Sequence, residues 1–316
     1  MMSYILILGG FVALYIGGEL FMSGAVSISQ KLRIPPLIIG LTIASIATST
    51  PEIMVAIRSA FEDMPDLAAG SVVGTNVVNV YLILALAALI MPIVVDRVAI
   101  RANLLFMIIA SSALLVAGLL FGEIGRIAGI VFLLILAGYY IHSYYHARTF
   151  DEHPEEVIGD IRTVSTLWAA LLLIAIAIVF LTAGSHWLVD GASAIAQQFG
   201  LSEAVIGLTI VAFGTSLPEL TLCVIGALRG HSSLAFGNIV GSHIINILAV
   251  LGVTSIIKPI ALSPLLVRYD IPLLLILTLL LALVLELRGK IGRITAVLFL
   301  LVYVSYLVFT FTTVLA

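Results

Sequence analysis

Two glutamates, Glu52 and Glu219, stand in apolar stretches that are near copies of each other. The first copy reads GLTIASIATSTPE over 40–52 and the second reads GLTIVAFGTSLPE over 207–219, an offset of 167 residues. A charged side chain at the centre of a bilayer costs about 2.5–3.5 kcal/mol on insertion scales, so an ionisable residue at that depth indicates a functional site. Two carboxylates at matching positions predict one symmetric site for a cation.

A proline precedes each of these glutamates, Pro51 in the first copy and Pro218 in the second. Proline has no N–H to donate, and its ring collides with the carbonyl four residues earlier, which for Pro218 is that of Gly214. The helix should break there, and backbone oxygens freed at membrane depth need protein or a bound ion as a partner. The oxygens expected at the site from these two segments belong to Ser45, Thr48, Ser49, Glu52, Ala212, Thr215, Ser216 and Glu219.

A second pair of segments repeats at the same offset, LAAGSVVGTNVVN over 67–79 and LAFGNIVGSHIIN over 234–246. Thr75 and Asn79 are four residues apart, as are Ser242 and Asn246, so each pair should share one helix face. Glycines four apart in each segment form small-residue stripes that allow close helix packing. These segments are therefore expected to pack against the glutamate segments and to add hydroxyl and amide oxygens.

Together the segments offer two carboxylates, six hydroxyls, two amide oxygens and several carbonyls, with no sulfur and no imidazole clearly in place. Hard oxygen ligands in a flexible cage suit Ca²⁺, whereas Mg²⁺ requires a tight octahedron and keeps its waters. Two glutamates neutralise one divalent cation, and without it they repel each other. The site should therefore recruit Na⁺ or protons when Ca²⁺ leaves, which is the chemistry of an antiporter.

The elements that position these residues must cross a membrane. The chain has 316 residues, of which 62% are apolar and 10% charged, with a mean hydropathy of +1.27, which is the composition of an integral membrane protein. The first apolar run has no basic flank and no cleavage site, so it is expected to be a retained helix. Apolar runs long enough to cross a bilayer occupy 4–27, 36–60, 70–92, 101–121, 126–147, 167–190, 203–228, 234–257, 270–288 and 293–314.

The repeat predicts an all-α integral membrane protein of ten transmembrane helices, arranged as two inverted five-helix repeats. The repeats are expected over 1–150 and 165–316, with a polar linker over 151–164. Because each half has an odd number of spans, the second enters the membrane from the opposite side. Inverted repeats are typical of secondary transporters, which bind their substrates near the midplane. Duplication can also build a merely symmetric bundle, but such a bundle has no need of buried carboxylates.

The distribution of Lys and Arg predicts the orientation in the cell membrane. The odd-numbered loops carry ten of these residues and the even-numbered loops four, which places the odd loops and the linker in the cytoplasm and both termini outside. A net charge of −3 gives no indication of a nucleic-acid partner, and the lone Cys223 excludes a disulfide within the chain. The lipid bilayer is the expected environment, and no obligatory protein partner is evident.

With these motifs the chain resembles the calcium/cation antiporter superfamily, specifically the prokaryotic sodium/calcium exchangers. The resemblance covers nearly the whole chain and implies four ion sites around the two glutamates. It also implies alternating access, in which the first and sixth helices slide across a fixed core. By resemblance, Glu52 and Glu219 coordinate Ca²⁺. Na⁺ and Ca²⁺ would share Thr48, Ser49, Thr75, Thr215, Ser216 and Ser242, with carbonyls near Ser45 and Ala212.

The chain departs from the family pattern at several positions. Asn79 and Asn246 stand where many exchangers have at least one aspartate, so three Na⁺ would leave the site with a charge of +1. Ala47 and Ser71 replace a usual glycine and asparagine in the first half. Three further groups have no assigned role: Glu19, its repeat counterpart His186, and His243.

Several functions are compatible with these residues. The favoured one is a Na⁺/Ca²⁺ antiporter without enzyme activity, and the alternative couples Ca²⁺ or another divalent cation to protons at the same site. Absent aspartates and His243 favour the proton, whereas the proline-containing T-S-x-P-E motif favours sodium. An intramembrane enzyme would need paired aspartates, a Ser–His pair or a histidine cluster, and no expected span holds two aspartates. A channel is disfavoured because tight carboxylate sites bind rather than conduct.

Overall fold

The computed structural model describes residues 2–62, 64–147, 163–199 and 212–315, and 87% of it is helical. Most of the expected linker and residues 207–211 of the second motif lie outside this range. In the first half, the helices are α1 (Met2–Leu32), α2 (Pro36–Ile39), α3 (Ser45–Thr48), α4 (Thr50–Phe61), α5 (Pro65–Val78), α6 (Leu84–Ile90), α7 (Arg97–Phe121) and α8 (Arg126–Ala147). In the second, they are α9 (Leu167–Gln198), α11 (Ala212–Thr215), α12 (Leu217–Leu228), α13 (Ser232–Ile245), α14 (Gly252–Ile257), α15 (Ile271–Arg288) and α16 (Arg293–Leu315).

Short π-helical segments interrupt several of these helices. They are η1 (Gly40–Ala44), η2 (Asn79–Ile83), η4 (Asn246–Leu251) and η5 (Leu266–Asp270). Segment η2 joins α5 to α6, and η4 joins α13 to α14, so each of these pairs forms one continuous helical span.

The helices have the lengths and composition of membrane spans. Seven described helices are apolar enough and long enough to cross a bilayer, and α2–α3 with α4 form a broken eighth, bent by 41°. Two shorter apolar stretches, Leu217–Leu228 and Arg293–Val308, add to these within the described residues. Each expected run overlaps one of these helices, although 203–211 lies outside the described range. The chain is therefore an all-α, multi-pass membrane protein.

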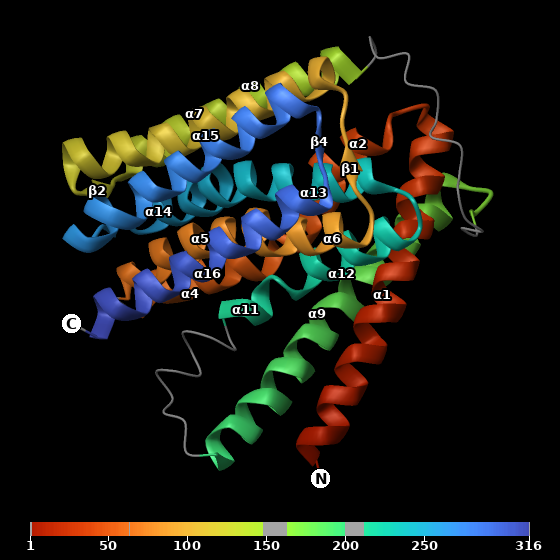
Figure 1. Cartoon of the computed structure of the whole chain (residues 1–316), viewed down its shortest axis with the longest axis horizontal. Helices are drawn as coiled ribbons and strands as arrows, with labels where there is room; N and C mark the ends of the chain where they lie inside the picture. The colour runs from red at the N-terminus through yellow and green to blue at the C-terminus, as the bar shows by residue number, and fades with distance from the viewer. Residues whose placement is uncertain (1, 63, 148–162, 200–211, 316) are drawn as a thin grey trace.

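Helices α5–α6 and α13–α14 form the centre of the molecule (Figure 1). The span containing α13 is 83% buried, whereas only 22% of the α8 span and 33% of the α15 span are buried. This difference follows from sequence, since α13 combines apolar residues with glycines that permit close packing on every side. The outer helices need only one packed face, because lipid solvates their apolar outer face.

Helices α1 and α9 lie side by side and extend away from the other helices (Figure 1). Small residues repeat every seven positions on each: Ser3, Gly10, Gly17 and Gly24 on α1, and Ala170, Ala177, Gly184 and Gly191 on α9. A Cβ added at Gly10 would lie 2.8 Å from the Gly184 carbonyl oxygen, and one at Gly24 would lie 2.9 Å from that of Ala170. The two backbones therefore pack too closely to accept larger side chains.

Two short antiparallel strand pairs join the halves. β1 (Ile93–Val94) pairs with β4 (Lys290–Ile291), and β2 (Glu123–Ile124) pairs with β3 (Ile260–Ala261). The 167-residue offset converts β1 into β3 and β2 into β4, so each half contributes one strand to each pair. The register Ile93↔Ile291 likewise becomes Ile260↔Ile124. The two halves thus make equivalent contacts with each other.

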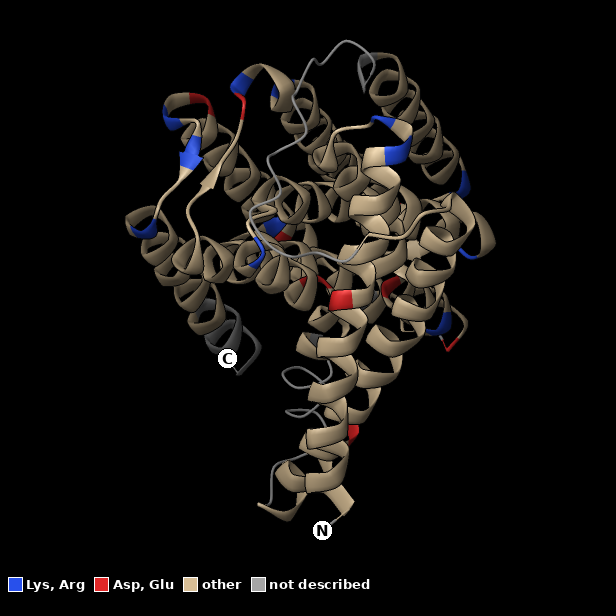
Figure 2. Ribbon diagram, turned by 90° about the vertical axis from the view of Figure 1, so that its right-hand side faces the viewer, with Lys and Arg blue, Asp and Glu red and all other residues tan. Residues whose placement is uncertain are grey.

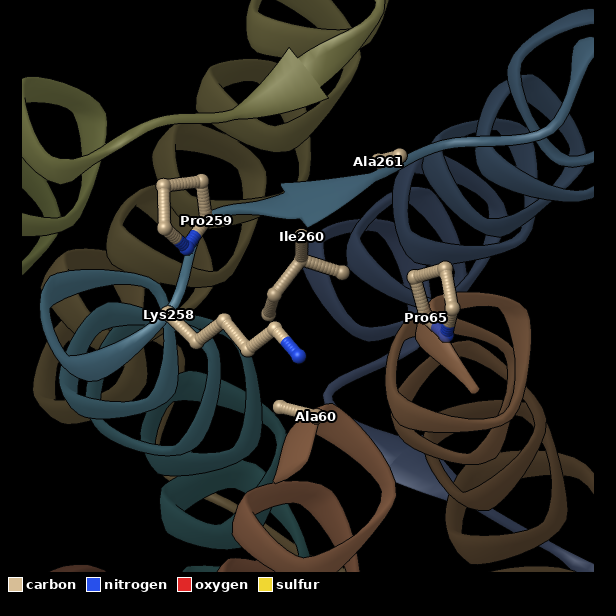
Figure 3. A pocket seen from close by; sticks show the side chains of 6 residues that line it. All are labelled: Ala60, Pro65, Lys258, Pro259, Ile260 and Ala261. Carbon is tan, nitrogen blue, oxygen red and sulfur yellow. The ribbon is translucent and has the colours of Figure 1, made fainter. Parts of the chain in front are cut away.

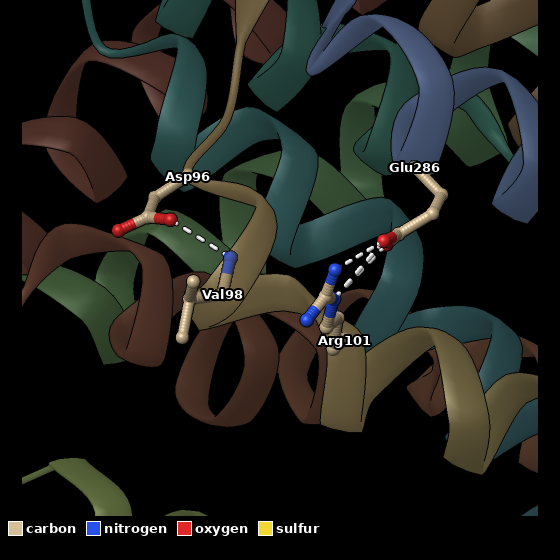
Figure 4. A network of polar contacts seen from close by, with 4 residues as sticks. All are labelled: Asp96, Val98, Arg101 and Glu286. Atoms are coloured by element: carbon tan, nitrogen blue, oxygen red, sulfur yellow. Dashed lines mark hydrogen bonds and ion pairs between the residues drawn. The ribbon is translucent and has the colours of Figure 1, made fainter.

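Charged side chains lie mainly at helix ends and in turns, and the long helices between them are uncharged over most of their length (Figure 2). At the start of α7, Asp96 accepts a hydrogen bond from the Val98 backbone N–H at 2.8 Å and caps the helix (Figure 4). One turn later Arg101 forms an ion pair with Glu286 of α15, with Nε 3.1 Å from Oε1 (Figure 4). The exposed Arg101–Glu286 ion pair joins α7 to α15 at the surface.

Candidate ion-binding site

Both proline-containing motifs break their helices, as predicted. In the first copy α3 ends at Thr48 and α4 begins at Thr50, and in the second α11 ends at Thr215 and α12 begins at Leu217. Ser49 and Ser216 occupy the two breaks, with nearly identical backbone angles of φ −78° and ψ 2° and of φ −87° and ψ 2°. Each glutamate then lies in the first turn of the following helix, where unpaired backbone N–H groups favour negative charge.

The oxygen-bearing side chains predicted for the site are buried. Glu219 is fully buried and Glu52 is 4% exposed, and Thr215 is half-buried. Ala212 opens α11, but its side chain lies outside what the structure describes. The remaining predicted residues are all buried: Ser45, Thr48, Ser49, Thr75, Asn79, Ser216, Ser242 and Asn246.

Many of these buried oxygens lack a well-formed hydrogen bond within the part of the chain that the structure describes. Within the described residues, none of the four carboxylate oxygens of Glu52 and Glu219 makes a hydrogen bond of normal geometry. The same holds for the Ser49 and Ser216 hydroxyls and for the Oδ1 atoms of the two asparagines, Asn79 and Asn246. Burying a polar group without a hydrogen bond costs about 1–3 kcal/mol, and more when it is charged. A cluster of such acceptors is the arrangement that a cation stabilises.

Contacts between the two halves bring these residues together. Thr48 Oγ1 donates to Asn238 Oδ1 at 3.2 Å and lies 3.3 Å from Ser242 Oγ. The two carboxylates interact electrostatically with each other, and Glu52 also interacts with Thr215. The hydroxyls of Thr48 and Ser242 likewise interact with the Glu219 carboxylate. The site is therefore shared, since each glutamate meets hydroxyls from the other half of the chain.

The π-helical segments at the site were not predicted from the sequence. Segments η2 and η4 begin at Asn79 and Asn246, the residues expected to lie one helical turn after Thr75 and Ser242. A π-segment inserts an extra residue into the turn and often marks a functional site. Asn246 Nδ2 donates to Asn76 Oδ1 at 3.4 Å, so the wider turn also places the two amide-bearing helices in contact.

The glycine stripe of the second copy packs as predicted. A Cβ added at Gly237 would lie 2.4 Å from the Leu37 carbonyl oxygen, and one at Gly241 would lie 2.7 Å from that of Leu41. Helix α13 thus lies directly against the α2–α3 segment that carries the first motif. The equivalent partners of Gly70 and Gly74 fall in 200–211, outside the described residues.

The carbonyl freed by Pro218 has a partner that sequence analysis missed. Ser185 of α9 donates its hydroxyl proton to the Gly214 carbonyl oxygen. Gly18 is the repeat counterpart of Ser185 and has no side chain to offer at the equivalent position. The hydrogen bond connects the α1–α9 pair to the broken helix of the second motif alone.

The structure also places the three groups that had no assigned role. Glu19 of α1 forms an ion pair with Arg229 at the end of α12, with Oε1 2.7 Å from Nη2. His243 Nε2 lies 3.0 Å from Ser111 Oγ and 3.5 Å from Thr278 Oγ1, so it contacts α7 and α15 through residues not predicted for the site. His186 is exposed on α9.

One small pocket lies at the end of α4, away from the glutamates. Its volume is about 150 Å³ and its walls are uncharged except for Lys258, whose side chain points toward Ala60 (Figure 3). With an amine and no carboxylate among its lining residues, this pocket does not suit a cation.

Comparisons with known proteins agree with the sequence motifs. A family model described as "Sodium/calcium exchanger protein" matches the chain twice, over residues 2–145 and 169–312. The putative antiporter CaxA of Alkalimonas amylolytica is 36% identical over 318 residues, covering 97% of this chain and 98% of that protein. The sodium/calcium exchanger MaX1 of Methanosarcina acetivorans is 27% identical and covers 98% of both chains.

The fold matches a solved exchanger as well. The sodium-calcium exchanger NCX_Mj, soaked with 2.5 mM Na⁺ and 0.1 mM Ca²⁺, superposes with a TM-score of 0.82 at 30% identity, over 98% of each chain. The family model covers most of the chain in two matching halves, and the solved relative shares its fold from end to end. The chain therefore belongs to the sodium/calcium exchanger family of calcium/cation antiporters.

Proposed function

We propose that this protein exchanges Na⁺ for Ca²⁺ across the cell membrane, at a midplane site built around Glu52 and Glu219. The observation that carries the proposal is the pair of buried carboxylates whose four oxygens make no hydrogen bond of normal geometry with described residues. Such a pair is stable when a divalent cation neutralises it, and hydroxyl and amide oxygens around it match the oxygen coordination of Ca²⁺.

Competition between ions at this site accounts for the exchange. A Ca²⁺ ion bound by both glutamates leaves them uncompensated when it dissociates, so Na⁺ ions then occupy the same oxygens. The hydroxyls of Thr48 and Ser242 interact with Glu219, and that of Thr215 interacts with Glu52, so they can bind Na⁺ beside each carboxylate. Because both ions need the same carboxylates, binding of one promotes release of the other.

The proposed architecture is ten transmembrane helices in two inverted five-helix repeats, over 1–150 and 165–316, with a linker over 151–164. Helix bounds support it, because α4 and α12, α3 and α11, and α5 and α13 coincide after a shift of 167 residues. The two strand pairs are also related to each other by the shift of 167 residues. Alternating access would move the α1–α9 pair relative to the remaining helices, since that pair packs internally through small residues and extends away from them.

The proposed orientation places both termini outside the cell and the linker in the cytoplasm. It rests on the excess of Lys and Arg in the odd-numbered loops. Under this orientation, the turn that holds Arg229 faces the cytoplasm and the turn that holds Glu62 faces outward.

A proton-coupled exchanger at the same site is the second candidate. It is favoured by Asn79 and Asn246, which leave the site without a third carboxylate. The contacts of His243 weaken the argument for proton coupling that rests on this residue, since its Nε2 faces Ser111 and Thr278 rather than the glutamates.

The deciding experiment is ⁴⁵Ca²⁺ uptake into proteoliposomes loaded with Na⁺, at equal pH on both sides. Uptake should require the outward Na⁺ gradient and should disappear in both Glu52→Gln and Glu219→Gln. Glu286→Gln, which removes a carboxylate at the surface, is the matched control and should transport normally. Uptake that ignores Na⁺ and follows an imposed pH gradient would establish the proton-coupled alternative instead.

A further inference from the structure

The α1–α9 pair contacts the two halves of the chain unequally. Helix α1 packs along α12, and α9 contacts both α11 and α12, which together carry the second motif. The 167-residue repeat relates the packing of α1 along α12 to a packing of α9 along α4. Among the described residues, α9 does not pack along α4 to the extent that α1 packs along α12. The pair, which also contacts α2 of the first half through α1, therefore packs along α12 and not along α4, although these two helices share the same bounds and the same motif.

The pair itself is symmetric, so it is suited to either surface. Gly10 faces Gly184, and the close approach of Gly24 to Ala170 is repeated by that of Gly191 to Ser3, its counterpart after the shift. A rotation that exchanges α1 with α9 would leave this packing unchanged. It would also exchange α12 for α4 as the partner of the pair.

The contacts made on the second half include two polar ones. The Glu19–Arg229 ion pair joins α1 to α12, with Oε1 2.7 Å from Nη2 and 3.1 Å from Nε, and both side chains are about one-third exposed. Ser185 donates a hydrogen bond to the Gly214 carbonyl. Between them, Gly18 of α1 lies against Ile225 and Thr221 of α12 without a side chain of its own.

On the first half, the repeat counterparts of these residues differ in chemistry, and a histidine–glutamate contact would take the place of the glutamate–arginine ion pair. His186 replaces Glu19, and Glu62 replaces Arg229, where it already binds Arg58 at 2.7 Å. Gly18 replaces Ser185 and has no hydroxyl for the carbonyl of Ala47. The two halves thus differ in sequence at the positions that would hold the α1–α9 pair against α12 in one arrangement and against α4 in the other.

We propose that Glu19, Arg229 and Ser185 are positioning residues for transport, which hold the α1–α9 pair against α11–α12 and bias the exchanger toward the conformation seen here. They act by setting the balance between two docking positions of the pair. This inference rests on the proposed alternating access, but not on which ion is coupled to Ca²⁺.

The test measures how often α9 reaches α4. Thr182 and Glu62 are the repeat counterparts of Tyr15 and Arg229, which interact in the present arrangement. A Thr182→Cys/Glu62→Cys variant, with the buried Cys223 left in place, is treated in membranes with a short bifunctional thiosulfonate. Cross-linking then reports the second docking position, and the two single-cysteine variants control for background.

Removal of either polar contact should raise the rate of cross-linking. Glu19→Gln should raise it about two- to fivefold, the range that a partly exposed ion pair supports, and Ser185→Ala should raise it by a similar factor. Exchanging the charges, as Glu19→Arg with Arg229→Glu, should restore the parent rate. Glu286→Gln breaks an ion pair between α7 and α15 and should have no effect.

Three results would overturn the inference: no cross-linking in any variant, an unchanged rate in Glu19→Gln, or an equal rise in Glu286→Gln. Because the reaction needs no ion gradient, it separates this inference from the proposed function. A failure of Na⁺-driven uptake with the expected cross-linking would remove sodium coupling and leave the positioning role intact.

Discussion

Replacing Glu219 by glutamine should reverse the order of stability between the wild type and the variant, depending on Ca²⁺. In ion-free buffer, with choline in place of Na⁺ and a chelator present, the wild type holds two buried carboxylates without well-formed hydrogen bonds. Glutamine keeps the shape of the side chain but removes one charge and its repulsion from Glu52. An unsatisfied buried charge costs more than an unsatisfied neutral amide, for which the cost is about 1–3 kcal/mol, so the variant should be more stable by an amount of the same order.

Calcium should reverse this order. A ligand that binds only the folded protein stabilises it by about 2.7 kcal/mol at a concentration one hundred times its Kd. The wild type should gain this increment, whereas the variant, with half of the carboxylate charge, should gain little. Its unfolding free energy in Ca²⁺ should therefore fall below that of the wild type.

The assay is equilibrium unfolding in detergent micelles, followed by the fluorescence of the two tryptophans, in ion-free buffer and across a Ca²⁺ titration. Glu286→Gln removes a surface carboxylate and should follow the wild type in both conditions. A Glu219→Gln variant that is less stable than the wild type without ions, and that still gains stability with Ca²⁺, would refute the assignment of Glu219 to the cation site.

Three further predictions concern the scaffold. Gly237→Ala should lower stability by about 1–3 kcal/mol in thermal unfolding, because its Cβ would lie 2.4 Å from a backbone oxygen; Gly138→Ala, at an exposed position with open space, should not. Burial lowers the pKa of His231 in the α12–α13 turn. Its neutral folded form should therefore cost stability as pH falls below about 6.5, where the unfolded chain binds a proton, and His231→Met should show a smaller loss in the same pH series. Tyr81 donates a hydrogen bond of 2.6 Å to the Leu277 carbonyl, so Tyr81→Phe should cost about 0.5–1.5 kcal/mol in equilibrium unfolding.

Local chemistry explains why the helix breaks could be predicted. Proline removes a backbone donor wherever it stands in a helix, so Pro51 and Pro218 determine breaks at Ser49 and Ser216 without reference to the rest of the fold. The membrane depth of both glutamates was predicted from the apolar runs that hold them, whereas their burial among protein side chains depends on how the helices pack. The periodic glycines of α13 likewise predicted a close contact, which Gly237 makes with α2.

The π-segments at Asn79 and Asn246 had no comparable signal. A widened turn depends on what packs around it, and its sequence reads as ordinary apolar helix. The partners of Glu19, Ser185 and His243 were also out of reach, because each bond joins residues at least 29 positions apart. Their geometry depends on how whole helices pack.

The sequence by itself determined that this chain crosses the membrane repeatedly, that it is duplicated, and that each copy brings a glutamate to a broken helix. These properties follow from composition, from internal identity and from the stereochemistry of proline, all of which act locally. Only the tertiary structure decided which copy the α1–α9 pair contacts and which side chains hold it there. The two docking surfaces share helix bounds and the Pro-Glu pair of the motif, so the choice between them depends on a few long-range contacts that no local pattern contains.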